Sequence, residues 1–281
     1  MEHALPHWFQ WMKYAVYGLL MINTGLFLQE ELTSFDYLFA DGISTELLIQ
    51  AFSATIDTAA WVILLLMFEL ETCVLPDEVI RGKVKWGLHG LRIFCYLFIG
   101  YACYGYIAEM LYYYGGNVQP LSAAGACALG EGWSILVKLD EFQPLTAENC
   151  GLLQGALWQV GDGLVVADAD TLRATRWLAW TDVINSATWI LVVLVLEIDV
   201  RLQLRGAYAG RLLLASKASK LVLYSILFAA AVYWGFEGDF LDFWDAFLWL
   251  FAFFFIEQNL FAWQAETEAE AELDSVAGPA S

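Results

Sequence analysis

The chain has 281 residues, of which 60% are hydrophobic and only 16% are charged, and its mean hydropathy is +0.57. A soluble domain usually has about 25% charged residues, spread over all its surface elements. Here the polar residues fall into blocks between apolar runs long enough to cross a bilayer, which argues against a soluble fold. The net charge of −19 excludes nucleic acid as a partner, because phosphate binding needs basic clusters.

Six apolar segments predict an all-α integral membrane bundle of six transmembrane helices. The segments are approximately Met12–Gln29, Leu48–Phe68, Leu91–Tyr113, Trp177–Leu196, Leu221–Phe236 and Phe243–Trp263. Tryptophan and tyrosine residues flank several of them, as is typical of the membrane interface. The first segment has no small-residue cleavage site after it, so we expect a retained helix and not a signal peptide.

The basic residues predict the orientation of these spans. With six spans, ten of the 13 Lys and Arg residues fall on one side, mostly in the loops after the second and fourth segments. The positive-inside rule then places the N-terminus and the C-terminus in the cytoplasm of a cell (inner) membrane. The acidic tail, residues 264–281, would be cytoplasmic too. We interpret it as a solvated or disordered extension, with a docking tail for a basic partner as the alternative.

The long loop of residues 114–176 is expected to form a small domain outside the cytoplasm. Cys127 and Cys150 are its only cysteines, and an exported loop is where a disulfide persists, although two free thiols are the alternative. The ranges Trp133–Leu139 and Ala156–Val166 are strand-like, and Gly161 to Gly163 is typical of a hairpin turn. The loop is therefore predicted to contain β-structure stapled by a disulfide worth about 3 kcal/mol.

The second and third segments resemble the fourth and fifth as two copies of one helical hairpin. A shift of 128 positions aligns Asp57 with Asn185 and Trp61 with Trp189. It also aligns Glu69 with Glu197, Glu71 with Asp199, and Arg92 with Lys220. Both copies cross the membrane in the same sense, so the repeat is parallel. Internal repeats are frequent in transporters, whose binding sites lie near the repeat interface.

Ionisable residues inside the spans are the best pointers to function, since each costs about 2.5–3.5 kcal/mol at the centre of a helix. Asp57 lies in the second span, and Asp182 and Asn185 lie one turn apart in the fourth. They are candidates for a polar path in the outer half of the membrane. The alternative is that Asp57 and Asn185 only form hydrogen bonds between helices.

A further candidate is Glu257 in the sixth span, although its side chain could instead extend to the inner interface. Asp245, at the start of the same helix, is interpreted as ordinary charge complementation of a helix N-terminus. Acidic residues at the cytoplasmic ends of the spans are expected to pair with basic residues on the returning helices. The expected pairs are Glu69 with Arg92 and Glu197 with Lys220.

Several classes of chemistry have no sequence signal. The histidines, at positions 3, 7 and 89, all lie outside the predicted spans, which excludes paired haem ligation within the bundle. The chain has no Walker loop, no CxxC motif and no zinc-type spacing. We therefore predict no enzymatic activity, no catalytic residues, no metal site and no cofactor.

Two functions remain. The first is an ion channel or transporter for a cation or proton that uses Asp57, Asp182, Asn185 and Glu257. The alternative is a non-transporting scaffold, assembly or sensor subunit that acts through its outer domain and a cytoplasmic stalk. In both cases the expected partners are the lipid bilayer and a second copy of the chain or another membrane protein.

Overall fold

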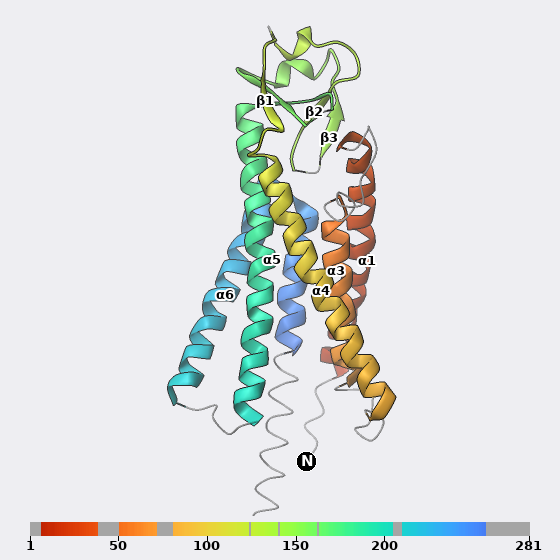
Figure 1. The fold of residues 1–281 in the computed structure, drawn as a ribbon, viewed down its shortest axis with the longest axis vertical. Helices are drawn as coiled ribbons and strands as arrows, with labels where there is room; N and C mark the ends of the chain where they lie inside the picture. The colour runs from red at the N-terminus through yellow and green to blue at the C-terminus, as the bar shows by residue number, and fades with distance from the viewer. Residues whose placement is uncertain are drawn as a thin grey trace, which may run out of the picture.

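The computed structural model describes residues 7–38, 51–71, 81–123, 125–139, 141–161, 163–204 and 210–256. Most of them form a bundle of long helices capped at one end by a small sheet (Figure 1). The helices are α1 (His7–Leu38), α3 (Ser53–Glu69), α4 (Gly82–Tyr112), α5 (Ala169–Leu204), α6 (Gly210–Glu237) and a last helix over residues 240–256. Glu257 and the predicted acidic tail lie outside the described residues.

Among the described helices, α4, α5 and α6 are long and apolar enough to cross a membrane. This number is smaller than the six spans that the apolar segments predict. Helix α1 is long, but polar residues such as Lys13 and Asn23 lower its hydropathy. Helix α3 has 17 residues, and the described part of the last helix is of similar length, so both are short. The three apolar helices indicate a membrane protein.

The helices pack side by side in chain order, with their axes roughly along the long axis of the molecule (Figure 1). Helix α3 packs on α1 and α4, α4 packs on α5, and α5 packs on α6. We call the two ends of the bundle the sheet end, where α5 begins, and the hairpin end, where α4 and α6 begin (Figure 1). Helices α3 and α5 and the last helix all run from the sheet end toward the hairpin end.

Ion pairs tie each helical hairpin together near the hairpin end. Arg92 of α4 binds Glu71 at 2.5 Å, and Lys220 of α6 binds Asp199 of α5 at 3.2 Å. The predicted partners Glu69 and Glu197 were wrong by two residues in both hairpins.

The two acids that were expected in those hairpin pairs have other partners. Glu69 binds the buried Lys13 of α1 at 2.5 Å, and it also accepts a hydrogen bond from Tyr14. Glu197 binds Arg201 one turn along α5 at 2.9 Å. The helical twist explains the difference, because a residue two positions along a helix points to a different neighbour.

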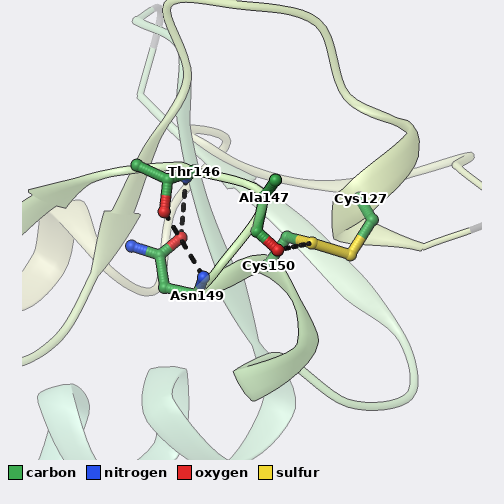
Figure 2. Close-up of a disulfide and its surroundings, with 5 residues drawn as sticks. All are labelled: Cys127, Thr146, Ala147, Asn149 and Cys150. Atoms are coloured by element: carbon green, nitrogen blue, oxygen red, sulfur yellow. Dashed lines mark hydrogen bonds between the residues drawn. A yellow bond between two sulfur atoms is a disulfide. The ribbon is translucent and has the colours of Figure 1, made fainter.

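Five strands form the sheet at the other end, in the order β1-β4-β5-β2-β3. They are β1 (Val118–Leu121), β2 (Ser134–Leu136), β3 (Phe142–Pro144), β4 (Leu157–Val160) and β5 (Val165–Asp168). Strands β4 and β5 form the predicted antiparallel hairpin, while β2 and β5 pair in parallel. The predicted disulfide joins Cys127 and Cys150, with the Cα atoms 5.0 Å apart (Figure 2).

The sheet is fixed to the bundle by side chains at its base. Tyr113 donates a hydrogen bond from its hydroxyl to the backbone oxygen of Leu139 at 3.1 Å. Arg176 of α5 donates to the backbone oxygen of Tyr113 at 2.8 Å. Lys138 donates to the backbone oxygen of Gly238, in the turn that precedes the last helix, at 2.8 Å. The sheet therefore contacts the turn that leads into one of the helices of the site.

Asp168 joins the sheet to α5. Its carboxylate accepts hydrogen bonds from the backbone N–H groups of Thr171 at 2.8 Å and Gln154 at 3.2 Å. The first of these hydrogen bonds makes Asp168 the N-cap of α5, because it satisfies a backbone N–H of the first turn that would otherwise have no acceptor. Partial burial raises the pKa of Asp168, but these backbone hydrogen bonds outweigh it and lower the pKa below the ordinary value of 3.8.

Candidate functional site

A cavity of about 50 Å³ lies inside the bundle, and it collects an unusual number of acidic side chains. Four aspartates line it, namely Asp57, Asp182, Asp242 and Asp245. Asn185 and Tyr106 also line it. None of the residues that line this cavity in the described part of the chain is basic. We call it the acidic cavity.

The polar residues of the acidic cavity come from four helices. Asp57 lies on α3, and Tyr106 lies on α4. Asp182 and Asn185 lie one turn apart on α5. The structure thus brings together three of the four residues that the sequence singled out as an ion path, while Glu257 lies outside the described residues.

Two residues of the cavity escaped the sequence analysis. Asp245 was interpreted as a helix-terminus charge, and Asp242 lies just before the predicted sixth span. Their spacing of three residues is the signal that was available, because it matches the spacing of Asp182 and Asn185. Two polar residues one turn apart at the start of an apolar helix present one polar face to its neighbours.

Two of the carboxylates have hydrogen-bond donors from other helices. The indole Nε1 of Trp234, on α6, donates to Asp182 at 3.2 Å. The amide Nδ2 of Asn23, on α1, donates to Asp245 at 2.9 Å. Asn23 is only 2% exposed, so this bond is the reason that a buried amide is tolerated in α1.

Two other side-chain oxygen atoms of the cavity have no hydrogen-bond partner among the described residues. Asp57 is 9% exposed, yet its Oδ1 has no hydrogen-bond partner among the described residues. The Oδ1 atom of Asn185 has no partner there either. A buried carboxylate oxygen without a partner costs several kcal/mol, roughly, unless something binds it. The arrangement therefore leaves one anionic and one neutral acceptor available to a ligand.

Three tryptophans form the wall of the cavity nearer the hairpin end. Trp61, Trp189 and Trp249 each follow a polar residue of the cavity by four positions, on α3, α5 and the last helix. Their ring centroids are 6.5, 6.3 and 6.4 Å apart for the pairs 61–189, 61–249 and 189–249. Phe253 packs on Trp189 with a centroid distance of 4.5 Å. We call these three indoles the tryptophan triangle.

A second cavity, of about 280 Å³, lies on the other side of the tryptophan triangle. Trp61, Trp249 and Phe253 line both cavities, so they form the partition between them. Arg92 and Glu197 add charged groups to this second cavity. Its remaining described lining is mostly aliphatic and aromatic.

A third cavity, of about 670 Å³, lies at the sheet end between α1, β3 and the turn before the last helix. Glu30, Glu141 and Asp239 line it, and no basic residue does so in the described part of the chain. From the sheet end toward the hairpin end, the bundle thus contains this third cavity, then the acidic cavity, and then the aromatic partition.

No family model, no curated protein and no solved structure matches this chain.

Proposed function

We propose that this protein is a membrane channel or transporter that moves a cation or a proton through the acidic cavity. The observation that carries the proposal is the meeting of four aspartates from three helices in one cavity without a basic neighbour in its described lining. A carboxylate at membrane depth costs about 2.5–3.5 kcal/mol on insertion scales. A bound cation or proton offsets that cost, whereas a purely structural bundle could use neutral side chains instead.

The proposal includes six membrane spans. Helix α3 and the last helix contribute Asp57 and Asp245 to a cavity that α4 and α5 also line. Because α4 and α5 are apolar enough to span, their partners around the same cavity would lie at the same depth. The positive-inside rule then puts the hairpin end, the N-terminus and the C-terminus in the cytoplasm.

We also propose that the two hairpins, α3–α4 and α5–α6, arose by duplication. The ion pairs Glu71–Arg92 and Asp199–Lys220 are related by the same shift of 128 positions that aligns the two segments. Trp61 and Trp189, which this shift also aligns, pack against each other. The acidic cavity would then lie between the two copies, which is where repeat-built transporters place their sites.

Flux measurements on the purified full-length chain in liposomes test the proposal. We expect cation or proton flux that Asp57→Asn reduces by at least tenfold. Asp170→Asn is the matched control, because Asp170 also carries one charge but is exposed at the start of α5. The proposal would be overturned if liposomes that contain the wild-type protein pass neither cations nor protons under either sign of membrane potential.

A sensor or assembly role is the second candidate. It is favoured by the disulfide-bonded sheet, which contacts the turn before the last helix through Lys138 and Gly238. A partner that binds the sheet could act on that helix through this contact. Co-purification of one defined partner that is lost when residues 121–171 are deleted, together with absence of flux, would favour this role.

A further inference from the structure

We infer that the acidic cavity is a binding site for one small monovalent cation, with Asp57 Oδ1 and Asn185 Oδ1 as its direct ligands. The inference rests on the proposed function, since it takes the cavity to be part of a cation path. It adds the chemical class of the ion and the two oxygen atoms that hold it.

The ligand atoms follow from the hydrogen bonds of the cavity. Asp182 and Asp245 each accept a hydrogen bond from another helix. Asp57 Oδ1 and Asn185 Oδ1 are fully buried oxygens of residues that line the cavity, and neither has a hydrogen-bond partner among the described residues. Asp57 is more than nine-tenths buried, so water cannot freely solvate its carboxylate. A cation between α3 and α5 would satisfy both oxygens.

The charge of this pair suits a monovalent ion. One carboxylate and one amide oxygen carry a single negative charge between them. A calcium ion takes six to eight oxygen ligands, several of them carboxylates, and magnesium demands a near-ideal octahedron. No group of three or more acidic, His or Cys residues is close enough to hold a metal ion in the described part of the chain. Although four aspartates line the cavity, the described residues therefore do not bring three of these charged groups together around one point, as a divalent site requires.

The size and the aromatic lining of the cavity also favour a small monovalent cation. A cavity needs a volume of about 10–15 Å³ to hold one buried water. The acidic cavity, with a volume of about 50 Å³, therefore accepts one ion with a few waters. Magnesium releases its water shell reluctantly, which disfavours its entry. Four tryptophans also line the cavity, and an indole ring attracts a cation over its face. That attraction helps a cation that enters with only part of its hydration shell.

Tryptophan fluorescence provides the test, because four indoles line the cavity. The purified full-length chain in nanodiscs is titrated with Na⁺, K⁺, NH₄⁺, Ca²⁺, Mg²⁺ and choline at constant ionic strength. We expect a saturable signal with at least one of the small monovalent ions. We expect none with the divalent ions or with choline, which is too large for the cavity. A saturable signal with Ca²⁺ or Mg²⁺ alone would overturn the inference.

Two variants at the ligand positions sharpen the test. Asp57→Asn should weaken monovalent binding at least tenfold, while Asp170→Asn should leave it unchanged. Asn185→Asp supplies a second carboxylate and should add binding of Ca²⁺. Because it is a gain, it cannot be explained by a failure to fold. Monovalent binding that survives Asp57→Asn with unchanged affinity would overturn the inference.

The failure of this inference can be told from the failure of the proposed function. Asp57-dependent proton flux without any saturable monovalent signal would overturn the cation site and support the proposed function. Saturable monovalent binding in a protein that shows no flux would support the cation site and overturn the proposed function.

Discussion

Replacing Trp189 with alanine should loosen the partition between the acidic cavity and the cavity toward the hairpin end, because Trp189 packs against the three residues that form it. Trp189 is 6% exposed, and its ring contacts Trp61, Trp249 and Phe253. An aromatic pair contributes about 0.5–1.5 kcal/mol beyond its buried area, so three such contacts contribute about 1.5–4.5 kcal/mol. If they stabilise the closed partition, their loss lowers the ratio of closed to open molecules by about 10- to 2000-fold.

The assay is cation flux from liposomes that contain equal amounts of folded wild-type or variant protein. We expect Trp189→Ala to raise the flux at least tenfold and Trp189→Phe, which keeps a ring, to raise it less. Trp177→Ala is the matched control, because Trp177 lies on the same helix but is 60% exposed. The reasoning fails if Trp189→Ala lowers the melting temperature and leaves the flux unchanged, since the triangle would then serve packing alone.

Three further predictions concern stability. Lys13→Met should destabilise the chain by about 3–5 kcal/mol by stranding the buried Glu69, and adding Glu69→Leu should recover most of that loss in a thermal melt. Cys127→Ser should cost about 2–4 kcal/mol, and reduction of the wild-type disulfide with Cys150 should reproduce it. Asp168→Asn keeps an N-cap but removes a charge. Because the folded pKa of Asp168 is lowered, its charge stabilises the fold above about pH 4 and loses that effect as pH falls through the folded pKa. The gap in melting temperature between wild type and Asp168→Asn should shrink as the pH falls below about 4, and a constant gap would refute the role of the charge.

The parts of the fold that the sequence predicted are those specified by local patterns. Apolar runs predict helices because a membrane leaves few other ways to satisfy the backbone. The disulfide was predictable because Cys127 and Cys150 are alone in a polar loop. The parallel pairing of β2 with β5 was not predictable, since it joins three-residue and four-residue strands that are far apart in sequence. Such pairing depends on tertiary packing, not on local propensity.

The same contrast holds for the site. Asp57 and Asn185 stand out because each interrupts an apolar run, and a polar residue there needs a reason. Asp242 and Asp245 do not stand out, because acids near a helix start are common for electrostatic reasons. The pairing of Glu71, and not Glu69, with Arg92 depends on the rotation of α3 about its axis. A hydropathy profile contains no information on that angle.

The order of the cavities along the bundle bears on the mechanism. The acidic cavity and the third cavity, at the sheet end, both lie on one side of the tryptophan triangle. The second cavity, whose lining is mostly apolar, lies on the other side. If the protein conducts cations as proposed, a cation that approaches from the sheet end would meet the acidic side chains of these two cavities, which raise its local concentration. Its exit toward the hairpin end would then be closed by the uncharged indoles of the tryptophan triangle. On the proposed function, flux would require the triangle to separate. Because α3, α5 and the last helix each supply one indole, these helices would have to move apart. That requirement favours a gated channel or a transporter with alternating access over a permanently open pore.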